Sequence, residues 1–167
     1  MRRALLVVVV VTFACSNERR AQHEALAKSL ERPVSLLCAT SHPEAGGCDA
    51  DCAARVAAGE GKAARDAAEG LASIPPVSDP ATEGLLADVR KSARAVQRAF
   101  GGACKEAPPA DGAATDAVKA CAEMRAQVGW NVNDLRAALT RFGSNAELHS
   151  GVAMPVPTPE GCAKLAR

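Results

Sequence analysis

Cysteine is the residue type that most constrains the chemistry of this chain. The sequence of 167 residues contains seven cysteines, six of which follow residue 37. These six are Cys38, Cys48, Cys52, Cys104, Cys121 and Cys162. In an oxidising compartment an even set can form disulfides throughout, whereas an odd cysteine is left over. The six are therefore predicted to be disulfide-bonded, and Cys15 is predicted to have a different chemistry.

The spacing of the six cysteines suggests how they pair. Cys104 and Cys121 flank one expected loop, so their Cα atoms can come within disulfide range. Cys38 is expected to pair with Cys48 or Cys52, and whichever of these two is left then pairs with the last cysteine of the chain. Six cysteines allow many pairings, and spacing alone does not select one.

The cysteines of the first loop also offer an alternative, which is a metal site. Cys48 and Cys52 are spaced i, i+4, and His42 lies close to them in the sequence. Thiolates with an imidazole suit copper or zinc. Disulfides are the favoured interpretation, because C-x-x-C spacing is absent and an exported chain oxidises such thiols. The C-x-x-C-H motif that attaches haem is also absent. No cofactor is therefore predicted.

The residues before Cys15 have the pattern of an export signal. Two arginines precede an apolar run over residues 4–13, and small Ala14 stands before the cysteine. The run is too short for a membrane span, which needs about 20 apolar residues. The segment Thr-Phe-Ala-Cys that ends at Cys15 resembles the lipobox of bacterial lipoproteins. This resemblance covers the first 15 residues alone, and it implies cleavage after residue 14 and acylation of Cys15.

The predicted organisation follows from that resemblance. Residues 1–14 are expected to be a signal peptide and residues 15–167 a single helical domain with an extended, proline-rich tail over 144–167. The lipid would hold the domain at a membrane surface of the cell envelope. In a Gram-negative host this is the periplasmic side of the outer membrane, because Ser16 and not an aspartate follows the cysteine. Secretion without a lipid is the alternative.

The composition limits both the core and the partners. Hydrophobic residues make up 48% of the chain, but aromatic residues only 2%. Many of the apolar residues are alanines, which bury little area, so disulfides become important for stability. The formal net charge is +1. Nucleic-acid binding is not expected. It requires a strongly basic domain or aromatic side chains that stack on bases, and this composition offers neither.

Apolar residues recur at helical spacing in four segments, and no strand-like alternation occurs. The first two expected helices cover residues 18–38, with a kink or an interruption at Pro33, and 50–74, with a break near Gly59. The other two cover 80–100, after an Asp79 cap, and 113–143, with a split near Gly129 and a C-cap at Gly143. The predicted fold is therefore all-α: an antiparallel helical bundle of about four helices, some kinked or broken, stapled by disulfides.

Two features are candidates for contact with a partner. Arg90, Arg94 and Arg98 form a basic row on the helix expected over 80–100. The row could contact a phosphate-bearing lipid or an acidic polymer, although a solvated helix face is the favoured interpretation. Trp130, between a glycine and an asparagine, is a second possible contact residue.

No catalytic motif is present. The sequence lacks G-x-S-x-G, H-E-x-x-H and a glycine-rich phosphate loop. Its histidines, His23, His42 and His149, are expected to be solvated. The chain is therefore predicted not to be an enzyme but a membrane-anchored binding or scaffold module, whose partner is an unknown envelope protein or polymer. A metal- or haem-binding bundle and a small hydrolase are the alternatives.

Overall fold

The fold is all-α in the part of the chain that the computed structural model describes, residues 2–40, 60–103 and 114–166. Five helices occur there and no strand, which confirms the predicted helical bundle. The helices are α1 (Arg2–Cys38), α3 (Glu60–Ala72), α4 (Pro80–Ala103), α5 (Ala114–Ser150) and α6 (Pro159–Leu165). None of the helices in these ranges is both long and apolar enough to cross a membrane.

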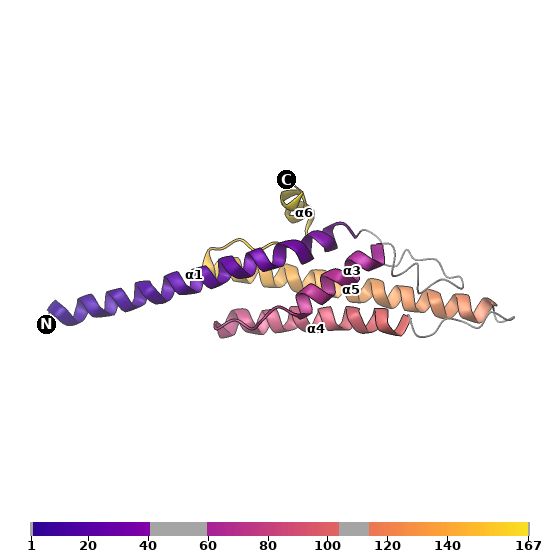
Figure 1. The fold of residues 1–167 in the computed structure, drawn as a ribbon, viewed down its shortest axis with the longest axis horizontal. Coiled ribbons are helices and arrows are strands. Elements are labelled where there is room, and N and C mark those ends of the chain that lie inside the picture. The colour runs from indigo at the N-terminus through magenta and orange to yellow at the C-terminus, as the bar shows by residue number, and fades with distance from the viewer. Residues whose placement is uncertain (1, 41–59, 104–113, 167) are drawn as a thin grey trace.

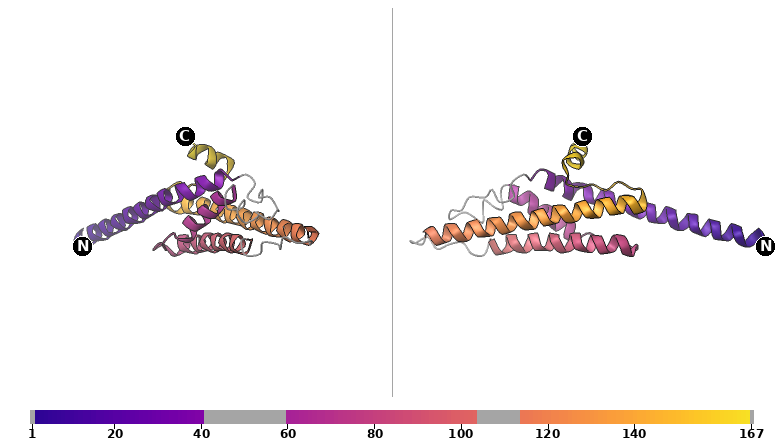
Figure 2. Two further views of the ribbon diagram at one scale, coloured as in Figure 1. Left: turned by 45° about the vertical axis from the view of Figure 1, so that its right-hand side comes forward. Right: turned by 180° about the vertical axis from the view of Figure 1, so that it is seen from behind.

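The helices pack as a layered bundle (Figure 1). The most extensively packed pair, α4 and α5, run antiparallel along each other, and the short α3 crosses between α1 and α4. The first part of α1 projects beyond the ends of the other helices. Seen from behind, α5 lies beside α4 along the whole of α4 (Figure 2). Only the C-terminal half of α1 therefore belongs to the packed body.

The core follows the 3-4 spacing of apolar residues in each helix. Apolar side chains at this spacing face inward, because successive ones lie on one stripe of the helix. The buried stripe of α1 consists of Leu26, Leu30, Val34 and Leu37. The stripe of α4 consists of Leu86, Val89, Ala93, Val96 and Phe100. The buried residues of α3 are mostly alanines, which let it cross close to its neighbours.

The predicted interruption at Pro33 is wrong, because α1 is a single helix through this residue. Pro33 is buried against α3, where Gly70 faces it. A Cβ on Gly70 would lie 3.0 Å from Cγ of Pro33, so the missing side chain of the glycine makes room for the proline ring. Packing between the two helices therefore compensates for the local preference of proline to break a helix.

The predicted split and end of the last long helix are also wrong. α5 passes through Gly129 without a break and continues beyond Gly143 to Ser150. Gly143 is buried, and a Cβ on it would overlap Cγ1 of Val156. The helix ends at Gly151 instead, which has a φ of 67° and whose N–H donates to the carbonyl of Glu147 at 2.8 Å. Only a glycine adopts this left-handed conformation without strain.

The tail after α5 returns to α1. It is extended as predicted, but only from residue 151, and it ends in α6, where Thr158 caps the helix by accepting a hydrogen bond from the Gly161 N–H at 3.1 Å. The return brings Cys162 beside the end of α1, where it forms a disulfide with Cys38 across a Cα–Cα distance of 5.5 Å.

This disulfide corrects the predicted pairing of Cys38 with Cys48 or Cys52. The reason is the return of the tail, which proximity in the sequence does not reveal. The predicted break near Gly59 and the residues Cys48, Cys52 and Cys104 lie outside the described residues. Cys121 lies in α5, but its side chain is not described, so its pairing with Cys104 stays a prediction.

Candidate functional site

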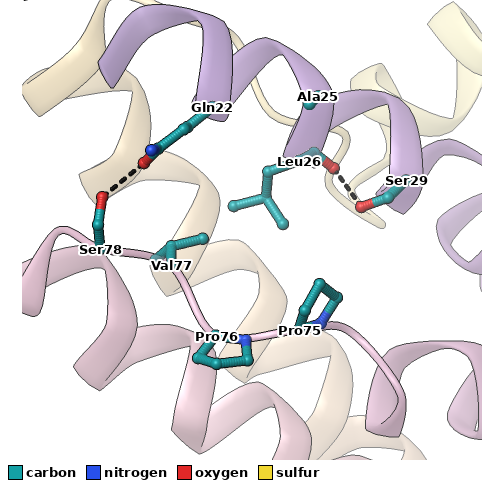
Figure 3. A pocket seen from close by; sticks show the side chains of 8 residues that line it. All are labelled: Gln22, Ala25, Leu26, Ser29, Pro75, Pro76, Val77 and Ser78. Atoms are coloured by element: carbon teal, nitrogen blue, oxygen red, sulfur yellow. Dashed lines mark hydrogen bonds between the residues drawn. The ribbon is translucent and has the colours of Figure 1, made fainter. Parts of the chain in front are cut away.

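The connection between α3 and α4 lies against α1 and encloses a pocket with it (Figure 3). The pocket has a volume of about 450 Å³. One wall comes from α1 and the other from the connection. The lining residues are Gln22, Ala25, Leu26 and Ser29 on α1 and Pro75, Pro76, Val77 and Ser78 on the connection. Segments about fifty residues apart in the sequence therefore build one site.

The inside of the pocket is apolar and its edge is polar. The Leu26 side chain points into it from α1, and the side chains of Val77 and Pro75 face it from the connection (Figure 3). At one edge the Ser78 hydroxyl donates to Oε1 of Gln22 at 2.6 Å. At the other edge the Ser29 hydroxyl donates to the Leu26 carbonyl at 2.7 Å. The site can thus hold an apolar group and offer hydrogen bonds around it.

An ion pair holds the connection in shape. The Val77 N–H donates to Oε2 of Glu83 at 2.9 Å, and Arg90 donates to Oε1 of the same carboxylate. Arg90 also donates to the Ile74 carbonyl at 3.3 Å, just after the end of α3. The Val77 N–H, and to a lesser degree Arg90, lower the pKa of Glu83 against the opposing effect of desolvation. The connection therefore has a defined conformation despite its two prolines.

The start of α4 confirms the predicted Asp79 cap. Oδ2 of Asp79 accepts the Thr82 N–H at 2.9 Å and the Thr82 hydroxyl at 2.5 Å. These two bonds lower the pKa of Asp79, the hydroxyl contributing most. Pro80 is the first residue of the helix, a position where a missing N–H costs nothing. The cap fixes the residue that directly follows the pocket wall.

His23 lies next to this cap, and the prediction that it is solvated is wrong. Its side chain is buried, with only 3% of its surface exposed. Nδ1 is 2.8 Å from the Arg19 carbonyl, and Nε2 is 3.2 Å from Oγ1 of Thr82. The start of α4 packs over this face of α1 and excludes solvent from the ring. His149 is exposed, whereas His42 lies outside the described residues.

The predicted contact residues do not line the pocket. Arg90 is engaged with Glu83, and only 12% of its side chain is exposed. Arg94 and Arg98 are exposed, and Arg98 borders a polar groove between α4 and α5. Trp130 is 70% exposed on α5. The basic row is thus divided between one internal ion pair and two solvated arginines.

The residues of the pocket were not predicted as a site. Pro75 and Pro76 lie on the short connection to Asp79, and this shortness is the signal in the sequence that could place the segment against another helix. No group of three potential metal-ligating side chains occurs among the described residues. The metal alternative at His42, Cys48 and Cys52 lies outside them.

Comparison with protein-family models, curated proteins and solved structures finds no match for this chain.

Proposed function

We propose that the chain is an exported envelope lipoprotein whose helical bundle binds a partner through the pocket between α1 and residues 75–78. The pocket is the observation that carries this proposal. Ligand sites are mostly apolar cavities of about 300–1,000 Å³ with a few placed polar groups. The volume of about 450 Å³ and the polar edge at Gln22 and Ser29 fit this description.

The disulfide supports export. Disulfides persist in oxidising compartments such as the bacterial periplasm and are rare in the cytosol. The bond between Cys38 and Cys162 joins the end of α1 to α6. Together with the lipobox resemblance at Cys15, it favours a location in the cell envelope over one in the cytosol.

The position of the pocket on α1 favours a partner close to the membrane. An α-helix rises about 1.5 Å per residue, so Ala25 lies about 15 Å beyond Cys15 along the axis. If acyl chains on Cys15 enter the bilayer, the pocket faces the space just above the lipid headgroups. An apolar group presented by another envelope protein can reach it there.

Binding fits the pocket better than catalysis does. The eight lining residues have aliphatic, hydroxyl or carboxamide side chains, or are prolines. None of these groups changes its protonation near neutral pH, so the lining cannot act as a general acid or base. The burial of Ala25, Pro75 and Val77 under a ligand would instead favour association through the hydrophobic effect.

The anchor is tested by Cys15→Ser. Two acyl chains give stable membrane attachment, and the serine variant cannot carry them on a thioether. We expect the wild type in the detergent phase of a phase partition and the variant in the aqueous phase, with unchanged helical circular dichroism. Mass spectrometry of the wild type should show acylated Cys15 as its first residue. A wild type that partitions into water, or begins elsewhere, would contradict the lipoprotein proposal.

The pocket is tested by Ala25→Leu, which fills it from an exposed position on α1. The probe is anilinonaphthalene sulfonate, whose fluorescence rises in apolar sites. We expect its affinity to fall on the order of tenfold, equivalent to about 1.4 kcal/mol. The matched control is Ala87→Leu on the exposed face of α4, which should bind the probe like the wild type. Equal affinity in both variants would refute the pocket as a binding site.

A further inference from the structure

We propose that protonation of His23 changes the hydrogen bonds that hold the pocket wall, and so makes the pocket responsive to pH. This inference rests on the proposed function, because it concerns the regulation of the same site. Four groups form a row: the Arg19 carbonyl, the His23 ring, the Thr82 hydroxyl and the Asp79 carboxylate. The row links α1 to the start of α4.

The donors and acceptors of this row can be counted. A carbonyl oxygen only accepts, so Nδ1 of His23 must carry a hydrogen for its 2.8 Å contact with the Arg19 carbonyl. Thr82 has a single hydroxyl hydrogen, yet its oxygen lies 3.2 Å from Nε2 of His23 and 2.5 Å from Oδ2 of Asp79. The charge on the ring therefore decides which way the hydroxyl points.

With two ring hydrogens, every contact in the row is a hydrogen bond. Nε2–H then donates to the Thr82 hydroxyl oxygen, and the hydroxyl donates to Asp79. When the ring releases a proton from Nε2 to solvent, Nε2 becomes an acceptor and competes with Asp79 for the same hydrogen. The carboxylate then keeps the Thr82 N–H but shares or loses the hydroxyl.

The charged groups around the ring come from two helices. On α1 these are Arg19 and, one residue on from the ring, Glu24, which pairs with Arg20 at 2.9 Å. At the start of α4 they are the cap residue Asp79 and, in the first turn, Glu83, which is engaged with Arg90. Among the described residues, α3 and α5 place no charged side chain in hydrogen-bond contact with the ring. Asp79 is thus the carboxylate coupled to His23, through one hydroxyl.

The row is continuous with the pocket wall. Ser78, which precedes Asp79, lines the pocket and bonds to Gln22, which precedes His23. Two adjacent cross-links therefore join α1 to the wall and to the start of α4, and the proton at His23 decides whether the Thr82 hydroxyl also bonds to Asp79. Loss of the hydroxyl bond to Asp79 weakens the cap that follows the wall, while the Gln22–Ser78 bond and the bonds of Val77 and Arg90 to Glu83 remain.

The row is tested by nuclear magnetic resonance on the mature protein without a ligand. The ring nitrogens of His23, the carboxyl carbon of Asp79 and the Ser78 amide are followed from pH 5 to pH 8. We expect the Asp79 and Ser78 signals to change with the same midpoint as the ring. Asp79 itself titrates below this range, because the bonds from Thr82 lower its pKa. A flat Asp79 signal, or a ring that keeps one charge throughout, overturns the proposal.

Two variants show whether the hydroxyl is the link. Thr82→Val removes the hydroxyl with little change in shape, and should leave the ring titrating while the Asp79 signal stays flat. Thr82→Ser keeps the hydroxyl and should restore the response. If the ring and Asp79 still share a midpoint in Thr82→Val, the hydroxyl is not the link and the proposal fails. If Thr82→Val does not fold, the magnetic-resonance titration of the wild type alone decides whether the proposal holds.

The regulation of binding has its own readout. The affinity of anilinonaphthalene sulfonate is compared at pH 5.5 and pH 8, where the charge of the probe is constant. We expect at least a twofold difference in the wild type and none in Thr82→Val. Equal affinity at both pH values in the wild type overturns regulation. A probe that does not bind at all overturns the proposed pocket and leaves the magnetic-resonance result to decide on the row.

Discussion

The two ends of the packed half of α1 are held by different chemistry. Near His23, α1 is joined to the α3–α4 connection and to α4 by hydrogen bonds among hydroxyl, carboxamide, imidazole and carboxylate groups. Near Cys38, it is joined to α6 by a disulfide and to α5 by Arg136. The buried stripe of leucine and valine side chains on α1 lies between these two ends. The first end can respond to protons, whereas the second can respond only to reduction.

Arg136 shows why the second end is insensitive to pH. Its guanidinium donates to the Leu37 carbonyl at 3.0 Å and to the Thr40 carbonyl. The Leu37 carbonyl, which also accepts the Thr40 N–H at 3.2 Å, lies at the end of α1 and the Thr40 carbonyl just beyond it. A cation there also complements the helix dipole. Arginine stays charged at any pH at which the protein is folded. The contrast between the ends can therefore be tested by mutation at each.

The largest effect is expected from removal of the disulfide, in the double variant Cys38→Ala/Cys162→Ala. Loss of a disulfide from a small exported domain lowers the free energy of unfolding by about 2–5 kcal/mol. Because α6 has no buried residue, it should detach while the other helices remain. Urea denaturation should show the loss at pH 7 and pH 4 alike. A stability equal to that of the wild type would show that the bond does not hold this end.

A smaller loss of unfolding free energy is expected from the matched variants Arg136→Met, at the Cys38 end, and Arg90→Met, at the His23 end. The two losses should differ in their dependence on pH. Each removes hydrogen bonds from a guanidinium to helix-end carbonyls, worth about 1.5–3 kcal/mol in total. The loss in Arg136→Met should be the same at pH 7 and pH 3. The loss in Arg90→Met should shrink at pH 3, because Glu83 becomes protonated and the wild type loses its ion pair too.

Urea denaturation of the wild type and both variants measures these differences. The pKa of Glu83 is lowered in the folded state, so its contribution is present above its unfolded pKa and is lost as the pH falls through the lower, folded one. Identical pH profiles for Arg136→Met and Arg90→Met would remove the proposed distinction between the ends.

The tail that carries Cys162 back to α1 is tested by Gly143→Ala. A Cβ there would overlap Val156, and overpacking of this kind costs about 1–3 kcal/mol. Val156→Ala in the same chain should recover part of the loss. Gly84→Ala is the control: this exposed glycine of α4 has nothing within 4 Å of an added Cβ, so the change should stabilise by up to about 1 kcal/mol. A destabilised control would show that helical glycines are needed for another reason.

The sequence predicted the helices where the local signals and the packing agree. The buried stripe from Leu86 to Phe100 and the Asp79 cap are local features, and both are confirmed. It failed at Pro33 and Gly143, where the local preference is for a break. Each of these residues packs against a residue outside its own helix, Gly70 and Val156 respectively. Such contacts depend on the tertiary fold and leave no trace in periodicity.

The candidate site was beyond sequence reasoning for a similar reason. Gln22 and Ser78 are common surface residues, separated by 56 positions, and only the folded chain brings them together. His23 lies on the same face of the helix as the buried Leu26, at a spacing of three, which was the one available signal that it is buried. The Cys38–Cys162 bond likewise required the path of the tail, across 124 positions.

The smallest effect is expected from Asp79→Asn at the His23 end. Asparagine is as good a helix cap as aspartate, so the variant should keep the α4 start and lose only the charge. The Thr82 hydroxyl, the Thr82 N–H and, more weakly, Arg19 and His23 lower the pKa of Asp79 in the folded protein. A lowered pKa stabilises the fold above the unfolded pKa of about 3.9, and this contribution disappears as the pH falls through the folded value. Asp79→Asn should therefore be less stable than the wild type at pH 7, by under about 1 kcal/mol because solvent screens this partly exposed group, and should match it near pH 2. Urea denaturation at the two pH values measures the gap, and a gap of the same size at both would show that the charge of Asp79 does not hold this end of α1.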